Sequence, residues 1–124
     1  MTDQRACFKK HVRLLKPVEF SRVFKNPVRS SDRLFTILAV PNEISHARLG
    51  LAISKKNAKR AVDRNRIKRL VRESFRLNMH NMLSIDLVVM AKPVTKSAEN
   101  QQILQSLQQH WIRLNKQCAK LSLD

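Results

Sequence analysis

The sequence predicts a single α+β domain in which helices pack on a sheet as a two-layer sandwich. Its 124 residues include 43% hydrophobic residues, enough to build one core but not two. Apolar side chains recur with helical spacing in some stretches and alternate as in strands in others. The resulting order is helix, three strands, helix, strand, helix. The whole chain, residues 1–124, is expected to form one domain, with a flexible segment at residues 1–11.

The first helix is expected to begin at Pro17, because the first turn of a helix does not need the N–H that proline lacks. Phe20, Val23 and Phe24 follow at the i, i+3, i+4 spacing of one helical face, and the next proline ends the helix. A short additional strand is expected near residues 28–31.

Two longer strands are expected next. Residues 34–40 are an apolar, partly β-branched run that a Pro-Asn pair ends. Residues 49–54 alternate leucine and isoleucine with the small residues Gly50, Ala52 and Ser54. We expect these two strands to be antiparallel neighbours, and we expect a helix or a ligand to approach the small-residue face of the second strand closely.

The second half of the chain predicts a helix from about residue 58 to residue 78, an interior strand at residues 85–91 and a long final helix. The strand is nearly all apolar, as expected for a strand covered on both faces. Both helices are amphipathic, and the first carries arginines opposite its apolar arc. The side chains predicted to face the core are Ile67, Leu70, Val71, Ser74 and Phe75 on the first helix and Ile103, Leu107, Trp111, Leu114, Cys118 and Leu121 on the last.

Composition narrows the function. Lysine and arginine number 25 against 9 aspartates and glutamates, and the net charge of +16 indicates a polyanionic partner. Gly50 is the only glycine, which excludes glycine-rich phosphate loops and dinucleotide-binding turns. Without a signal peptide or a run of about 18 apolar residues, a soluble cytoplasmic protein with no membrane partner is expected. Cys7 and Cys118 are expected to stay free in a reducing compartment, with a disulfide between them as the minor alternative.

Half of the net charge lies between residues 55 and 76, where ten basic residues accompany only two acids. A solvated helix would intersperse glutamate, because like charges four residues apart destabilise a helix. The excess favours a phosphate-backbone site over a merely solvated face, and arginine suits RNA because a guanidinium can bridge phosphates and stack on bases. Arg64 and Arg66 are expected to be exposed and to contribute little to folding. The ten residues are Lys55, Lys56, Lys59, Arg60, Arg64, Arg66, Lys68, Arg69, Arg72 and Arg76.

The basic segment contains Ser54-Lys55-Lys56, Ala61-Val62 and the run Arg64-Asn65-Arg66 that continues to Phe75. Together they closely resemble the signature of the protein subunit of bacterial ribonuclease P. Other segments resemble further parts of the same family, in the same order. They are Arg13-Leu14-Leu15, Phe20, Val23-Phe24, Leu49-Gly50-Leu51 and the strand from Val88 to Lys92. The resemblance covers roughly residues 12–121. It implies a small basic sandwich with a left-handed β-α-β crossover, similar to the second domain of ribosomal protein S5.

The resemblance implies an RNA-binding subunit of a ribonucleoprotein, the endoribonuclease that removes the 5′ leader of precursor tRNA. The catalytic RNA would supply the active site, with one protein per RNA, and Mg²⁺ would enter mainly through the RNA rather than be bound tightly by the protein. The residues implied to contact RNA are Lys55, Lys56, Arg60, Arg64, Asn65, Arg66, Lys68, Arg69, Arg72 and Arg76.

The same resemblance implies a cleft between the first helix and the sheet that accepts the single-stranded leader. Its implied residues are Phe20, Phe24, Thr36, Leu38 and Ala52. Stacking on aromatic rings tolerates most base sequences, as a processing enzyme with many substrates requires. Some members have a tyrosine where Leu38 stands, and this chain has no tyrosine, so leader binding is expected to depend more on the two phenylalanines. The alternative is that both rings belong to the core.

Other functions find less support in the sequence. The four histidines are far apart and the two cysteines lack close partners, so a zinc site is not expected. Asp63 and Asp86 are isolated carboxylates, whereas metal-dependent nucleases gather two or more. A small basic ribosomal structural protein is the main alternative, and a nuclease that works without RNA is a weaker one.

Overall fold

The computed structural model describes residues 12–14 and 16–123. Residues 1–11, which were expected to be flexible and which include Cys7, lie outside the described residues, as do Leu15 and the side chain of Leu121. The elements are α1 (Pro17–Lys25), β1 (Val28–Ser31), β2 (Phe35–Pro41), β3 (Arg48–Leu51), α2 (Ala61–Asn78), the short 3₁₀ helix η3 (Met79–Asn81), β4 (Ile85–Ala91), the 3₁₀ helix η4 (Pro93–Ser97) and α3 (Asn100–Leu123). The predicted α+β class is confirmed.

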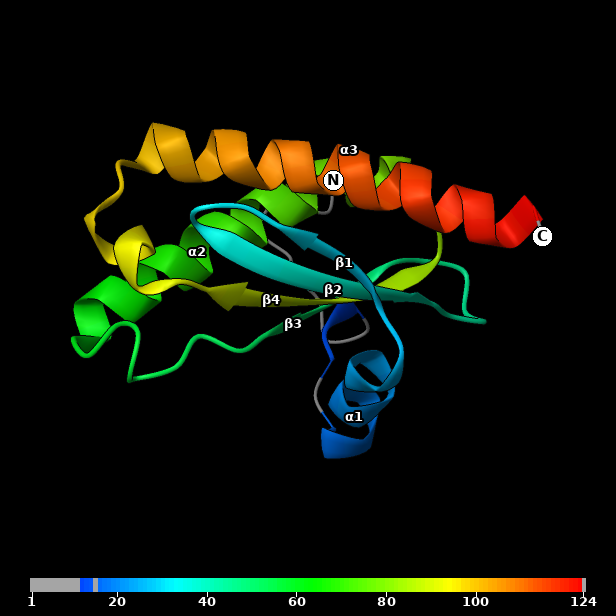
Figure 1. Ribbon diagram of the computed structural model, residues 1–124, viewed down its shortest axis with the longest axis horizontal. Coiled ribbons are helices and arrows are strands. Elements are labelled where there is room, and N and C mark those ends of the chain that lie inside the picture. The colour runs from blue at the N-terminus through cyan, green and yellow to red at the C-terminus, as the bar shows by residue number, and fades with distance from the viewer. Residues whose placement is uncertain (1–11, 15, 124) are drawn as a thin grey trace, which may run out of the picture.

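The four strands form one sheet in the order β1-β2-β4-β3 (Figure 1). The pairs β1–β2 and β2–β4 are antiparallel, whereas β3 is parallel to β4. The expectation that β2 and β3 are neighbours is therefore wrong, because β4 lies between them. Every residue of β4 except Met90 is buried, and a strand covered on both faces takes an interior place. Helix α2 joins β3 to β4, which makes the β-α-β unit of the fold.

Helices α2 and α3 cover one face of the sheet (Figure 1). Each predicted core residue on these helices whose side chain is described is buried. Trp111 meets Phe75 edge to face at a centroid distance of 6.1 Å, and its Nε1 donates to Ser74 Oγ over 2.8 Å. Cys118 is also buried, and burial raises the pKa of its thiol. The two amphipathic helices therefore supply the main core as predicted.

The segment that leads into α2 is less regular than predicted. Strand β3 ends at Leu51 rather than at residue 54, and α2 begins at Ala61 rather than near residue 58. Between them the chain turns at residues 55–57, and the backbone of Arg60 is extended. The basic residues before Ala61 therefore belong to a loop.

Helix α1 packs on the other face of the sheet and adds a short third layer (Figure 1). Val23 is fully buried in a second apolar cluster that includes Leu38 and Val88. A Cβ atom on Gly50 would lie 2.7 Å from two ring atoms of Phe20, so a larger residue there would displace the ring. The expected close approach to the small-residue face of β3 is confirmed, and a helix makes it.

A buried carboxylate ties α1 to the sheet. Asp86 on β4 is fully buried, and its register partner Arg48 on β3 donates Nε to Oδ1 over 2.9 Å and Nη2 to Oδ2 over 2.7 Å. Asn42 donates to Oδ1 over 2.8 Å, and Arg22 on α1 donates to Oδ2. Arg48 also pairs with Glu19 on α1 over 2.9 Å. Burial alone would raise the pKa of Asp86, but the hydrogen bonds from Arg48, Asn42 and Arg22 outweigh burial and lower the pKa.

Replacing this carboxylate should loosen α1 and destabilise the domain. We expect Asp86→Asn to lower the free energy of unfolding at pH 7 by about 3–5 kcal/mol, because it leaves arginine charges without their buried partner. Urea denaturation measures this loss. The matched control is Asp63→Asn, since Asp63 lies 4.0 Å from an exposed arginine, and it should cost less than about 1 kcal/mol.

The effect of Asp86→Asn should also depend on pH. Because the pKa of Asp86 is lowered in the folded state, its stabilisation is fully present above the unfolded pKa of about 3.9 and is lost as the pH falls through the lower folded pKa. The difference between wild type and variant should therefore shrink below about pH 4. A difference that stays constant down to pH 2 would contradict an ionised Asp86 in the fold.

Candidate RNA interface

The basic residues of segment 55–76 divide into two groups by exposure. Arg64, Arg66, Lys68 and Arg76 are half-buried. The exposed members are Lys55, Lys56, Lys59, Arg60, Arg69 and Arg72. Asn65, which was predicted together with them, is exposed on α2. The residues predicted to contact RNA therefore differ in how far their side chains are exposed to solvent.

Arg64 is held by the turn that precedes α2. Its Nη1 donates to the carbonyl oxygen of Ala58 over 2.9 Å and to that of Lys59 over 2.7 Å. Ala58 is buried, and its N–H donates to the carbonyl of Ser54 over 3.1 Å. The Arg64 guanidinium thereby closes the loop that carries the lysines in front of the helix.

Arg66 joins α2 to the start of α3. Its Nη1 donates to Asn100 Oδ1 over 2.6 Å, and its Nη2 donates to the carbonyl oxygens of Lys96 and Ala98, both over 3.1 Å. The expectation that Arg64 and Arg66 are exposed is therefore wrong. A guanidinium that satisfies carbonyl groups of another element stabilises the fold, because those groups would otherwise lose partners.

The two acids of the segment are each engaged by an arginine, which leaves other cations without compensation. Glu73 pairs with Arg76, and Asp63 lies 4.0 Å from Arg60. The cations whose side chains make no hydrogen bond or ion pair with the described part of the chain are Lys55, Lys56, Lys59, Lys68 and Arg69. Such a group attracts a polyanion, since its self-repulsion falls when phosphates approach.

A cleft of about 170 Å³ lies between α1, β3 and α2. Its lining residues are Arg13, Leu14, Phe20, Leu49, Leu51, Lys68 and Arg72. Phe20, which was predicted for the leader cleft, therefore shares a cavity with Lys68 and Arg72 of the basic segment. A ring beside cations suits single-stranded nucleic acid, because bases stack on the ring while phosphates meet the charges.

The other residues predicted for the leader cleft stand at different depths. Phe24 is 47% exposed, and Ala52 is half-buried. Thr36 and Leu38 on β2 are only 8% and 7% exposed. Leu38 belongs to the apolar cluster beneath α1, and Phe20 and Ala52 pack against that cluster. The structure thus brings Phe20, Leu38 and Ala52 together and leaves Phe24 at the surface of α1.

Two residues at this place were not among the predicted site residues. Arg13 lines the cleft and forms an isolated bridge with Leu49 of β3. Met90 on β4 packs against the same apolar cluster as Ala52 and is the register partner of Thr36. Spacing along the chain could not find either residue, because both reach the site through pairing between segments far apart in sequence.

A Ser-His-Asp cluster, in which the serine and the histidine are buried, lies at the contact between α3 and β1. Ser30 Oγ is 2.7 Å from Nδ1 of His110, and Asp32 Oδ2 is 3.1 Å from Nε2. Ser30 is 2% exposed and His110 is 0% exposed, so a substrate cannot reach the hydroxyl. Burial lowers the pKa of His110, although Asp32 acts in the opposite direction and raises it. The net lowering favours the neutral ring. These residues hold the β1–β2 turn against α3 and offer no nucleophile.

The described residues offer no set of metal ligands. No group of three or more histidine, cysteine, aspartate or glutamate side chains comes together among them. Asp86 is fully engaged by Arg48, Asn42 and Arg22, so its oxygens are not available to a cation. Among the helices of the described residues, none is long and apolar enough to cross a membrane.

Comparison with known proteins identifies similar chains. A model of the family described as Ribonuclease P matches residues 8–115. The ribonuclease P protein component of Methylococcus capsulatus is 50% identical over 112 residues, which cover 90% of this chain and 88% of that protein. The Staphylococcus aureus RNase P protein mutant with defective mRNA degradation activity superposes with a TM-score of 0.79 at 35% identity, over 86% of this chain and 90% of that chain. The RNase P protein from Thermotoga maritima gives 0.73 at 26% identity, over 82% and 96%.

The environments of Arg66 and Arg69 on α2 predict effects of different size on stability. Arg66→Ala should lower the free energy of unfolding by about 1–2 kcal/mol, because it removes the hydrogen bonds to the start of α3. Arg69→Ala removes the same charge from the same helix and should change stability by less than about 0.5 kcal/mol. Urea denaturation of both variants tests this, and equal stabilities would show that the Arg66 contacts contribute nothing.

Proposed function

Because this chain belongs to the ribonuclease P protein family, we propose that it is the RNA-binding subunit of a bacterial ribonuclease P. In this role it binds the catalytic RNA and the 5′ leader of precursor tRNA and assists the cut that gives the mature 5′ end. The observation that carries the proposal is the cleft in which Phe20 faces the same cavity as Lys68 and Arg72. The family match over most of the chain favours this function over a ribosomal structural protein.

The surface proposed to meet the catalytic RNA is the loop before α2 together with the exposed side of that helix. Lys55 and Lys56 stand on the turn, and Asn65 and Arg69 follow on α2, all exposed. The charges of Lys55, Lys56 and Arg69 are available to phosphates because the acids of the segment are already paired. Arg64 and Arg66 act differently in this proposal: they keep the loop and helix in place and so position the residues that touch RNA.

The leader is proposed to enter between α1 and the sheet. Phe20 is half-buried against Gly50, so its ring is held in place while one side can take part in stacking. Phe24 lies one helical turn further along α1 and is more exposed. Stacking without base-specific hydrogen bonds lets one protein accept leaders of many sequences, and the cations beside the rings bind the backbone that all leaders share.

The chemistry of cleavage belongs to the RNA in this proposal. No group of three or more metal-binding side chains forms among the described residues, and the serine and histidine of the Ser-His-Asp cluster are buried and closed to substrate. Mg²⁺ is proposed to be held mainly through the RNA, one protein is proposed to bind one RNA, and the complex is proposed to work in the cytoplasm. Reconstitution tests this: the protein with a ribonuclease P RNA should cleave precursor tRNA at low Mg²⁺, and the protein alone should not.

Binding to the catalytic RNA should be dominated by phosphate contacts. If about 6–10 phosphates are neutralised, affinity should fall by about 10³–10⁵ between ~50 and ~200 mM salt. The triple variant Lys55→Ala, Lys56→Ala, Arg69→Ala should make the salt dependence shallower by about 0.7–0.9 in log–log slope for each residue removed. Filter binding across a salt series measures both quantities.

The control for this triple variant removes the same charge elsewhere. Lys96, Lys116 and Lys120 are exposed outside the basic segment, and their joint replacement by alanine should leave the slope nearly unchanged. Equal effects of the two triple variants would mean that only net charge matters and would remove the basic segment as the specific RNA surface.

The two phenylalanines should affect leader recognition. Phe24→Ala should reduce the preference for precursor over mature tRNA by about 1–3 kcal/mol, the usual range for one base–aromatic stack, with little loss of stability because the ring is 47% exposed. Phe20→Leu should reduce the same preference while keeping apolar contact with the cluster beneath α1. Affinities for precursor and mature tRNA, measured with the melting transition on one preparation, separate the outcomes. An unchanged preference in both variants would remove both rings from the leader site.

A further inference from the structure

Arg29 is an exposed cation on the edge strand of the sheet. Among the described strands β1 pairs only with β2, and the side chain of Arg29 is exposed between half-buried Val28 and buried Ser30. Within the described ranges its guanidinium makes no hydrogen bond or ion pair. It therefore differs from Arg22, Arg48, Arg64 and Arg66, whose guanidinium groups are all engaged by other parts of the chain.

The register of the sheet puts Arg29 in line with the proposed leader cleft. Arg29 is the partner of Leu38, Leu38 is the partner of Val88, and Val88 is the partner of Gly50. Directly paired residues lie on the same face of a sheet, so this row crosses all four strands on the face that α1 covers. Phe20 lies over Gly50 at one end of the row, and Arg29 stands at the other.

The two ends of this row are close enough for a short single strand to reach both, passing outside α1 because Leu38 and Val88 in the middle of the row are buried beneath that helix. Three strand spacings of about 4.8 Å separate the Cα atoms of Gly50 and Arg29 by about 14 Å. The next row on the same face contains Ser31, Thr36 and Met90, and Ser31 is exposed while Met90 is half-buried. Lys92, just past the end of β4, donates its ammonium to Ser31 Oγ over 2.9 Å, which adds a second positive charge near this edge.

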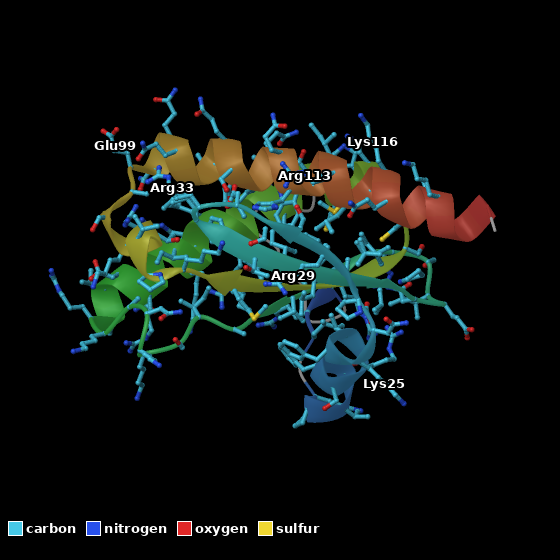
Figure 2. All side chains as sticks on the ribbon, viewed as in Figure 1. Lys25, Arg29, Arg33, Glu99, Arg113 and Lys116 are labelled. Carbon is cyan, nitrogen blue, oxygen red and sulfur yellow. The ribbon has the colours of Figure 1, made fainter. Side chains whose placement is uncertain are left out.

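We infer that Arg29 is the far end of the leader site and binds a leader phosphate upstream of the nucleotides that stack at Phe20. This inference rests on the proposed function. A guanidinium offers several donors that match phosphate oxygens, and an arginine that no protein group engages can give all of them to a ligand. Figure 2 labels Lys25, Arg29 and Arg33, which are cations of α1, of β1 and of the turn between β1 and β2. A polyanion leaving the cleft over β1 therefore meets positive charge.

A guarding role at the sheet edge is the competing explanation. Cations on edge strands prevent two sheets from pairing edge to edge, and Arg29 would then act on self-association rather than on RNA. The two explanations differ in one measurable respect, since only a phosphate contact depends on how far the leader extends.

The test combines substitutions of Arg29 and of a control residue with leaders of different length. Holoenzyme reconstituted with wild-type protein, Arg29→Ala, Arg29→Lys or Lys116→Ala is titrated with precursor tRNAs whose leaders are shortened one nucleotide at a time. Lys116 is the matched control, because it is an exposed cation on α3, on the opposite face of the sheet. Melting transitions and sedimentation of each protein show whether it is folded and monomeric.

The inference predicts a length-dependent effect. Arg29→Ala should reduce the salt slope for long leaders by about 0.7, which corresponds to about fivefold in affinity near ~0.1 M salt, and should have no effect once the leader is too short to reach β1. Arg29→Lys should retain part of the affinity, and Lys116→Ala should show no dependence on leader length.

Other outcomes would overturn the inference in distinguishable ways. An effect of Arg29→Ala that is equal at all lengths would mean general attraction of charge, and self-association with unchanged leader affinity would mean that Arg29 guards the sheet edge. If wild-type affinity itself does not depend on the leader, the proposed leader site fails, and this inference fails with it. If wild-type affinity depends on the leader and Arg29→Ala changes nothing, only this inference fails.

Discussion

The buried carboxylate of Asp86 is the interaction on which the geometry of the cleft depends. A single charge on β4 receives hydrogen bonds from β3, from the residue that follows β2 and from α1. A buried charge is stable only together with its partners, because removing one member of a buried ion pair leaves the other desolvated without compensation. Helix α1 is therefore held at one place on the sheet, and Phe20 comes to lie against Gly50. The charge that places the ring is thus separate from the charges proposed to bind RNA.

Arginine performs two different kinds of work in the basic segment. Arg64 and Arg66 donate hydrogen bonds to carbonyl groups of the protein, whereas the side chain of Arg69 remains exposed. Spacing and charge predicted that this segment carries the function, but they could not separate these roles. The partners of Arg66 lie 30 to 34 residues further along the chain, and only the packing of α3 on α2 brings them near. The burial of Leu38 and Phe20 could not be predicted either, because it depends on where α1 packs on the sheet.

The elements of the fold were predictable because each depends on local pattern. The apolar arc from Ile67 to Phe75 and the stripe on α3 predicted the buried faces of both helices. Strand pairing was less accessible, and β2 and β3 were wrongly expected to be neighbours. Adjacent strands in sequence often pair, but the apolar character of β4 on both faces gives it the interior position that separates them. The network around Asp86 was missed for the same reason, since it joins residues that only this pairing brings together.

During synthesis β4 is the last strand to emerge, although it is the strand that β2 and β3 both need. Before residue 91 is available, β3 has no partner among the strands of the sheet, and β2 has only β1. Pairings between segments far apart in sequence form slowly, because a long loop must close first. The sheet is therefore completed in one late step. The nascent chain therefore exposes its full basic segment before its core is complete. The segment can attract polyanions before the folded domain holds it in place.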